Sequence, residues 1–511
     1  MKKKIGVLVD GENVPNWLYK SLERLKNGEF ADISLIIRTS NKVLKENNLL
    51  YTLYQNFDKK LISCANDAKE PTLLELDIPE LDVSNIADIK TYNLDIVLNI
   101  SKDLDVTKLI SCAKHGVWFY EGNSDYQHFY DVISREYLLT SSLVMQTKSA
   151  KIELATSSSQ VLGYSVLRDE NEQLWSLASL LPNEVKKLSS LGETRYFEEK
   201  KEILTQSEKL ISPTSLFMLS VFLKQSIAVA KKLFEKRFFK EQWFLMYENK
   251  ADLSLNGVSK FKHIVPSVEN FWADPFVVEE SGKHYLFIEE EPLNSHGHIS
   301  LITLEKDGTY GDAVPIIKQP YHMSYPSVFK HDKTYYMIPE TSENKSVELY
   351  VATDFPHTWE FKQNLMSDIH AVDTTLFYKD GLWWMFTSVT EFEGGWDNGS
   401  FSLFFSDNLF SSSWKEHPQN PISMNPNYSR MAGNVFEKDG KIYRPSQNSS
   451  KRYGYGFNLS EITKLSPTHY EEKIVSEVVP DWDKNILGVH TLNFSKDFTI
   501  IDGVQMRSRF K

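Results

Sequence analysis

Short apolar runs alternate with segments of helical spacing over the first 150 residues. The runs cover residues 5–9, 33–37, 96–100 and 117–120, and segments such as 17–26 and 106–114 separate them. Strands that alternate with helices are typical of βαβ units on a mostly parallel sheet. We therefore expect an open α/β domain over residues 1–150.

Residues 151–254 are expected to connect two domains and to contain a long amphipathic helix over residues 213–250. Ser212 suits the N-cap and Pro213 the first helical position. The apolar part, residues 215–230, includes Lys224 and Gln225 and is shorter than the roughly 20 residues of a spanning helix, so we expect no membrane span. The basic, aromatic residues 231–240 leave two interpretations open: an interdomain helix, or peripheral contact with anionic lipid.

A strand–turn–strand pattern recurs five times between residue 255 and the end of the chain. The frame is clearest where Asp-Gly, the preferred type I′ hairpin turn, follows an apolar run, as at 380–381 and 439–440. Equivalent anchor positions stand 51, 48, 59 and 58 residues apart, at Asp274, Tyr325, Asp373, Ala432 and His490. Five such units predict a five-bladed β-propeller over residues 255–511, closed by residues 489–503 as the last blade.

Candidate chemistry lies at the anchors, because the first strand of each propeller blade lines the axis. We expect Asp274, Tyr325, Asp373 and His490 to meet in a central funnel. A second ring, 15 residues further along, consists of Glu289, Glu340, Ser388 and Gln447. Carboxylates crowded into one concavity raise one another's pKa, as acid/base chemistry requires.

Composition and charge narrow the function classes. The 57 Lys and Arg against 69 Asp and Glu give a net charge of −12, which argues against a nucleic-acid partner. Aromatic residues make up 13% of the chain, which suits strands and sugar-stacking surfaces. The two cysteines provide neither a disulfide framework nor metal-ligand spacing, and the basic start lacks a signal-peptide core. We expect a cytoplasmic protein, with membrane association if the long helix contacts lipid.

Several segments of the repeat resemble two known groups. Residues 271–275 resemble the first blade of five-bladed arabinanase and xylosidase propellers, and that resemblance makes Asp274 the catalytic base. Segments 297–300, 321–326, 338–341, 430–433, 444–447 and 453–456 resemble the amino-terminal propeller of the glucosamine inositolphosphorylceramide transferase family. The resemblance covers about half the chain and implies a carbohydrate substrate.

One departure from the glycosidase pattern affects the expected reaction. Asp373 matches the pKa-modulating aspartate of that group, but Ala432 stands where its glutamic acid donor is expected. A sugar phosphate or nucleotide leaves as an anion and needs cationic stabilisation rather than an acid. Arg430, Arg444 and Arg452 are the candidates to stabilise such a leaving anion. The alternative is that Glu289 or Glu340 replaces the missing general acid.

We therefore expect a glycosyltransferase of surface-polysaccharide or glycolipid assembly, using an activated sugar donor, with its active site in the funnel. The alternatives are a glycoside hydrolase or phosphorylase of the propeller type, and a glycan-binding protein without turnover in which Trp272, Trp383, Trp384 and Trp396 stack on sugars. The catalytic candidates are Asp274, Asp373, Glu340 and Glu289. The substrate-binding candidates are Trp272, His298, Tyr325, Arg430, Arg444, Gln447, Arg452 and His490.

The amino-terminal domain resembles formyltransferase-like α/β domains at residues 94–98 and 115–123. Trp118 and Tyr120 stand at the positions of that family's Asn and His, and neither side chain replaces an imidazole base, so formyl transfer is not expected. Two interpretations remain: a nucleotide or sugar site near residues 10–13, at the carboxyl ends of the strands, or a degenerate scaffold.

His490 at the fifth anchor raises the question of an axial calcium ion. Some related propellers hold such an ion with a histidine nearby, but calcium prefers several oxygen ligands. The other interpretation is a histidine that is hydrogen-bonded to a funnel carboxylate, which orients the ring and raises its pKa.

Overall fold

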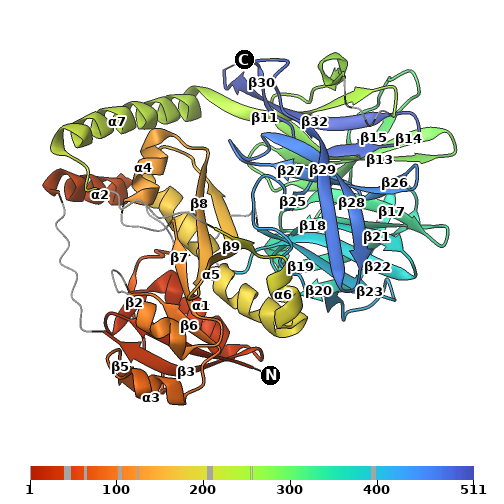
Figure 1. Cartoon of the computed structure of the whole chain (residues 1–511). Helices are drawn as coiled ribbons and strands as arrows, with labels where there is room; N and C mark the ends of the chain where they lie inside the picture. The colour runs from red at the N-terminus through yellow and green to blue at the C-terminus, as the bar shows by residue number, and fades with distance from the viewer. Residues whose placement is uncertain are drawn as a thin grey trace. The chain divides into compact units, whose positions relative to one another are not determined.

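The structure is a computed structural model that describes residues 2–39, 48–61, 66–101, 106–122, 126–203, 211–251, 253, 255, 257–392 and 399–510. The chain divides into two compact units (Figure 1). One comprises Met1–Ala230 with Phe392–Gly395, and the other comprises Lys231–Glu391 with Trp396–Lys511.

The amino-terminal unit is built on one eight-stranded sheet, in the order β10-β9-β8-β7-β6-β1-β3-β5. Its parallel part confirms the predicted α/β class and consists of β1 (Lys3–Val9), β3 (Ala31–Arg38), β5 (Glu80–Asp82), β6 (Ile96–Asn99) and β7 (Val117–Glu121). Its antiparallel part consists of β8 (Leu138–Gln146), β9 (Lys151–Gln160) and β10 (Lys201–Glu202). A separate short pair is β2 (Asn13–Pro15) with β4 (Pro71–Leu73).

The sheet continues beyond residue 150, into the stretch that the sequence assigned to a connection. The hydrophobic pattern does not predict β9, because its buried positions include Ser157 and Ser159 and apolar residues therefore do not alternate along the strand. The long helix α5 (Val166–Leu191) packs on β8 and β9, begins at the N-cap Ser165 and ends before Gly192, whose φ of 76° favours glycine. The remaining helices of the described part of this unit are α1 (Asn16–Asn27), α2 (Leu49–Leu61), α3 (Ile86–Thr91), η1 (Val106–Cys112), α4 (Gln127–Ser134) and α6 (Glu193–Glu198).

The predicted 213–250 helix is two elements. Helix α7 (Ser215–Phe238) ends at the start of β11 (Phe239–Glu248), which pairs along its whole length with β32 (Thr499–Ser508). Apolar residues occupy 243–247 without a helical period, as in a strand buried on both faces. Among the described residues, no helix combines the length and apolar character that crossing a membrane requires.

Five sheets form the β-propeller that the repeat predicts. Blade 1 contains β13 (Asn270–Glu280), β14 (Lys283–Pro292), β15 (His298–Leu304) and β16 (Val314–Ile317). Blade 2 contains β17 (Ser324–His331), β18 (Thr334–Thr341), β19 (Ser346–Asp354) and β20 (Thr358–Ser367). Blade 3 contains β21 (Ala371–Lys379), β22 (Leu382–Val389), β23 (Ser400–Ser406) and β24 (Lys415–Glu416). Blade 4 contains β25 (Arg430–Met431), β26 (Phe436–Lys438), β27 (Lys441–Asn448), β28 (Gly456–Ser466) and β29 (His469–Val478).

The fifth blade corrects the prediction that residues 489–503 close the ring by themselves. Its sheet joins β30 (Ile486–Gly488), β31 (Leu492–Phe494) and β32 to β11 and β12 (Lys262–Ile264) from the other end of the propeller. The ring is thus closed by hydrogen bonds between an early and a late strand. Two short 3-10 turns, η2 (Val258–Lys260) and η3 (Ser342–Asn344), complete the described elements of this unit.

The repeated sequence frame corresponds to a repeated bulge. The first strands of blades 1 to 3 lose register at Asp274, Tyr325 and Asp373, and these residues have φ values of 49°, 43° and 53°. Left-handed non-glycine residues are strained and cluster at functional sites. The predicted type I′ turns are also confirmed, since both residues of 380–381 and of 439–440 have positive φ.

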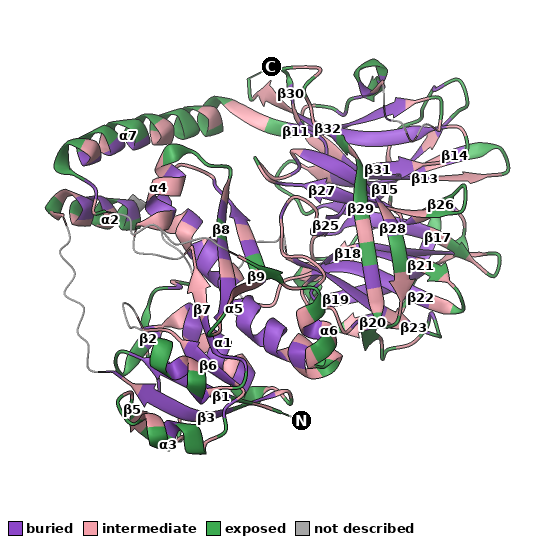
Figure 2. Ribbon diagram, viewed as in Figure 1, coloured by how far each residue is buried: buried purple, intermediate pink, exposed green. Residues whose placement is uncertain are grey.

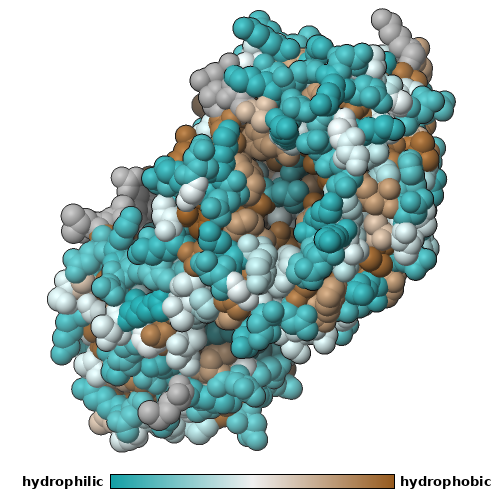
Figure 3. All heavy atoms as spheres, turned by 90° about the vertical axis from the view of Figure 1, so that its right-hand side faces the viewer, coloured by the Kyte–Doolittle hydropathy of each residue, from teal (hydrophilic) through white to brown (hydrophobic). Residues whose placement is uncertain are grey.

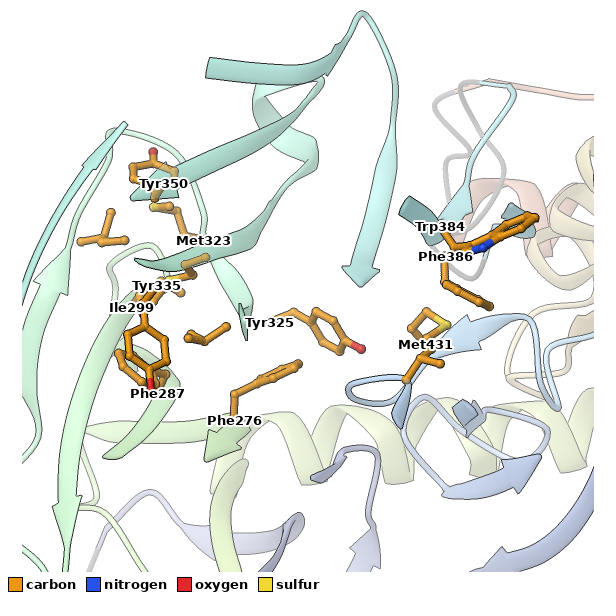
Figure 4. Close-up of a cluster of buried hydrophobic side chains, with 14 of the residues drawn as sticks. Phe276, Phe287, Ile299, Met323, Tyr325, Tyr335, Tyr350, Trp384, Phe386 and Met431 are labelled. Carbon is orange, nitrogen blue, oxygen red and sulfur yellow. The ribbon is translucent and has the colours of Figure 1, made fainter. Parts of the chain in front are cut away.

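Aromatic side chains fill the space between the blades, and buried residues concentrate on the strands (Figure 2). Tyr325 lies within a large hydrophobic cluster, near Phe276 and Met431, and its hydroxyl points away from Phe276 (Figure 4). That hydroxyl accepts the N–H of Gly433 at 2.7 Å and donates to the Gly433 carbonyl at 3.0 Å. Tyr325 therefore ties blades 2 and 4 together.

Candidate functional site

All five blades contribute to one cavity of about 460 Å³. A cavity of this size is within the usual range of small-molecule sites. It is lined by Trp243, Phe271, Ala273, Asp274, Glu289, Glu291, His322, Ser324, Glu340, Ser342, Glu343, Val372, Arg430, Tyr453 and His490. Figure 3 shows one face of the molecular surface, with a hollow in which hydrophilic and hydrophobic residues both occur.

Asp274 is held at the cavity wall by its bulge and by bonds from two other blades. Its Oδ1 accepts from the Thr491 hydroxyl at 2.8 Å, and its Oδ2 accepts from the Tyr325 N–H at 3.2 Å. Burial raises the pKa of Asp274, and His490 offsets part of that rise. The carboxyl group is therefore more basic than an exposed aspartate while its position is fixed.

His490 is fixed between an aspartate and an aromatic ring. Its Nδ1 lies 2.6 Å from Oδ2 of Asp502, and its ring stacks on Trp243 with centroids 4.1 Å apart. Burial lowers the pKa of His490, but Asp502 and Asp274 together outweigh burial, so the net pKa is raised. The geometry matches the interpretation of His490 as a partner of buried carboxylates.

The same residues fit an axial calcium ion poorly. Asp274, His490 and Asp502 approach one another closely enough to share an ion. However, Oδ1 of Asp502 already accepts the N–H groups of His490 and Thr491, and Oδ2 accepts that of Asp274. Calcium takes six to eight oxygen ligands, and the carboxylate oxygens of this cluster already accept protein hydrogen bonds.

Glu289 is a buried carboxyl group at the cavity whose protonation is favoured. It lies on β14, is buried, and has its Oε1 3.4 Å from Nε2 of His322. Burial and then Asp274 raise the pKa of Glu289 well above its ordinary value. Because Nδ1 of His322 accepts the Gly297 N–H at 3.2 Å, a neutral His322 carries its proton on Nε2, the ring nitrogen that lies 3.4 Å from Glu289.

Arg430 and Asp373 form a buried pair. Nε of Arg430 donates to Oδ2 of Asp373 at 2.5 Å, and the Gln447 amide donates to the same oxygen at 2.9 Å. Glu340 lies 3.6 Å from the guanidinium. Asp373 is thus a support for Arg430 rather than a cavity-lining group, and its burial raises its pKa to about 7 although Arg430 opposes the rise.

The structure brings five predicted residues to the cavity wall: Asp274, Glu289, Glu340, Arg430 and His490. Asp373 and Gln447 support Arg430 from behind, and Tyr325 is buried in the core beside Asp274. The sequence therefore identified two anchor residues, Asp274 and His490, as cavity residues. It also identified one residue on the return strand of blade 1, Glu289, and one on that of blade 2, Glu340.

Other predicted residues lie away from the cavity. Arg444 is fully buried and donates to Glu472 at 2.7 and 2.5 Å, and Arg452 donates to Glu241 at 2.8 Å. These two arginines are not available to stabilise a leaving phosphate, which corrects that expectation. His298 and Trp272 both face Glu290, at 3.5 and 3.2 Å.

The tryptophans proposed to stack on sugars are placed differently from that expectation. Trp383 and Trp384 are buried in hydrophobic clusters of the propeller, so their faces are occupied by other side chains. Trp396 lies outside the described residues. The tryptophan at the cavity is Trp243.

Sequence reasoning missed Trp243, His322, Tyr453 and Asp502. Trp243 lies on β11, before the repeat begins, and His322 and Tyr453 lie on loops between strands. Asp502 lies on β32, the strand that pairs with β30 and β31 on one side and with β11 on the other, and it stands outside both rings of equivalent positions. The available signal was Asp502 itself, a carboxylate directly after the apolar pair Ile500 and Ile501.

The cavity is acidic. Five carboxyl groups line it, against Arg430 and two histidines, and Arg430 is already paired with Asp373. A phosphate would meet this charge unfavourably, whereas hydroxyl or ammonium groups of a sugar would find acceptors.

Fold and cavity together define a five-bladed β-propeller with an acidic pocket built from all its blades. Residues 251–493 match the family described as "Glucosamine inositolphosphorylceramide transferase 1, N-terminal". The resemblance inferred from the repeat is thereby confirmed for this part of the chain. The formyltransferase likeness of the amino-terminal unit stays a prediction.

Curated relatives match part of the chain. Glucosamine inositolphosphorylceramide transferase 1 from Oryza sativa subsp. japonica is 34% identical over 207 residues, and the protein of that name from Arabidopsis thaliana is 30% identical over 207 residues. Each match covers 40% of this chain but only 28% and 27% of the relatives. An exo-1,5-alpha-L-arabinanase from a bovine ruminal metagenomic library has 14% identity and a TM-score of 0.34, covering 48% of this chain and 95% of that one.

Proposed function

We propose that this chain is a glycosyltransferase of glycolipid assembly and that its propeller cavity holds the sugar on which it acts. The names of the plant relatives support the reaction class. The observation that carries the proposal is the pair of buried carboxyl groups, Asp274 and Glu289, in one cavity with unequal tendencies to hold a proton.

The two carboxyl groups suit opposite roles. Glu289 holds its proton and can donate it to the oxygen of the leaving group as the bond to the anomeric carbon breaks. Asp274 can accept the proton of the attacking hydroxyl as the new bond forms. Glu289 then has lost one proton and Asp274 has gained one, so the charge of the pair is unchanged. His490 and Arg430 hold their carboxylate partners in place.

The charge of the cavity also bears on the donor. Because Arg430 is paired with Asp373 and two other candidate arginines lie elsewhere, the cavity favours a leaving group that takes up a proton over a phosphate. An amino sugar such as the glucosamine of the relatives' name suits this acidic surface.

Glycoside hydrolysis is the second candidate, since a protonated Glu289 would serve equally when water replaces the acceptor hydroxyl. Product masses distinguish the two reactions. Transfer gives a product heavier than the acceptor by one glycosyl residue, and hydrolysis gives the free sugar.

The test compares Asp274→Asn and Glu289→Gln with the wild type on a panel of activated sugars and glycosides, with acceptors present. Glu279→Gln, on the same strand as Asp274 but outside the cavity, is the matched control. We expect each cavity variant to lose at least about 100-fold in turnover while glycan affinity changes little. Unchanged turnover in both variants would refute the acid/base roles, and binding without turnover in the wild type would identify a glycan-binding protein.

A further inference from the structure

Helix α7 has two apolar faces, of which only one is covered. Met218 and Val221 are buried in a cluster with residues of α2 and α4, and the Gln225 amide donates to the Tyr54 hydroxyl at 3.2 Å. Leucine and isoleucine side chains occupy the opposite face, which is exposed along the helix (Figure 2). They are Leu216, Leu219, Leu223 and Ile227, with exposed fractions of 80%, 58%, 65% and 61%.

Seven exposed apolar residues of the helix form a straight stripe, here called the α7 stripe. It consists of Leu216, Leu219, Leu223, Ile227, Ala230, Phe234 and Phe238. Its steps of three, four, four, three, four and four residues make an 11-residue repeat, with about 3.67 residues per turn. This is close to the 3.6 of a straight helix, so the stripe stays on one side of α7 and suits a flat surface rather than a left-handed coiled coil.

The charge around the α7 stripe is the opposite of that of the whole chain. Five basic residues and one acidic residue lie on α7, whereas the chain carries a net charge of −12. At 100° per residue, Lys224 and Lys231 flank one edge of the stripe, and Arg237 flanks the other. Basic residues beside an exposed apolar stripe complement a surface with an apolar interior and an anionic outer layer.

We propose that α7 docks on the surface of an anionic lipid membrane, with the α7 stripe in the acyl boundary and the flanking basic residues at the headgroups. An interfacial helix needs an apolar face, a basic border and no span, and α7 meets all three conditions. The exposed Phe510, whose ring centroid is 6.0 Å from that of Phe238, extends the apolar surface at its carboxyl end. This proposal is independent of the chemistry in the propeller cavity.

The test is co-sedimentation of the full chain with two kinds of vesicle: phosphatidylcholine alone, and phosphatidylcholine with about one third phosphatidylserine. We expect binding to the anionic vesicles, weakened when the salt concentration is raised from 0.05 to about 0.5 M. Removing charge in Lys231→Gln with Arg237→Gln is expected to lower the partition coefficient roughly 5-fold per charge. Leu219→Gln with Leu223→Gln is expected to lower it at least about 10-fold.

Leu293→Gln is the matched control, since Leu293 has a similar exposed fraction of 55% but lies on a propeller loop. Circular dichroism and melting curves establish that each variant is folded. Equal binding to both vesicles, no binding to either, or no effect of the leucine variants would overturn the proposal. A concentration-dependent dimer that the leucine variants dissociate would assign the α7 stripe to a second copy of the chain instead.

Discussion

Tyr325 donates its backbone N–H to Oδ2 of Asp274, so the carboxylate at one blade's bulge accepts a hydrogen bond from the bulge of the next blade. The backbone N–H of Asp274 in turn donates to Oδ2 of Asp502, in the preceding blade, at 3.1 Å. Blades 5, 1 and 2 are therefore joined through buried carboxylates. The groups that give the cavity its chemistry also hold its wall together.

Asp274→Asn is expected to reduce stability as well as turnover. The amide offers one acceptor where the carboxylate offers two, so either Thr491 or Tyr325 loses its partner. We expect the free energy of unfolding to fall by about 1–3 kcal/mol in urea denaturation. Asp312→Asn, at an exposed position of the same unit, should stay within about 0.5 kcal/mol of the wild type.

His490 is expected to make the propeller less stable as the pH rises. Its pKa in the folded chain is raised by Asp502 and Asp274, so its contribution is complete below the ordinary histidine pKa and is lost as the pH passes through the raised value. His490→Gln should show a smaller decrease in melting temperature between pH 6 and about 9. The exposed His357→Gln serves as control, and an unchanged slope in His490→Gln would contradict the assignment.

Glu289→Gln is expected to stabilise the chain at alkaline pH. The folded chain keeps Glu289 protonated where the unfolded chain has lost that proton, and stability falls by about 1.4 kcal/mol per pH unit across that range. Glutamine resembles the protonated form, so the variant should melt higher than the wild type at pH 8, with the difference vanishing towards pH 4. A variant that is less stable at both pH values would argue for an ionised Glu289.

Variants of two buried arginines, Arg430 at the cavity and Arg444 in the core, distinguish an effect on ligand affinity from an effect on stability alone. Arg430→Met leaves Asp373 without its charged partner and should cost about 3–5 kcal/mol, and Arg444→Met should cost a similar amount through Glu472. Only Arg430 lines the cavity. Isothermal titration with a bound glycan should therefore show a changed affinity in Arg430→Met and an unchanged one in Arg444→Met, provided both remain folded at low temperature.

Gly433→Ala tests the packing of blade 4 against blade 5. A Cβ at Gly433 would lie 2.1 Å from the carbonyl oxygen of Leu492, and the φ of 148° is unfavourable for alanine. We expect a loss of about 3 kcal/mol or more. Gly440→Ala, with φ of 74° and open space around its Cβ, should lose only about 1 kcal/mol. Equal losses would show that backbone strain alone accounts for both.

The repeat was predictable because its signals are local. An anchor, an apolar run and an Asp-Gly turn lie within about 15 residues of one another, and the φ values of Asp380 and Asp439 match the expected turn. The anchors Asp274 and His490 followed from superposing the units. Glu289 followed from its fixed distance to Asp274.

The parts of the fold and of the candidate site that the sequence did not predict depend on contacts between distant segments. β11 lies outside the repeat, so nothing near Trp243 indicates that it pairs with β32 and stacks on His490. Arg444 and Arg452 looked like Arg430 in sequence, but the positions of Glu472 and Glu241 decide which arginine reaches the cavity. Such pairings depend on the assembled ring, and residue type alone does not specify them.

The closure of the fifth blade has a consequence for the newly synthesised protein. Trp243 leaves the ribosome long before His490, yet the two rings stack on one another in the finished cavity. Until β32 joins β11, Trp243 lacks His490 and Asp274 lacks Asp502. A nascent chain with four blades therefore has no complete cavity wall, and the cavity forms together with the last step of folding.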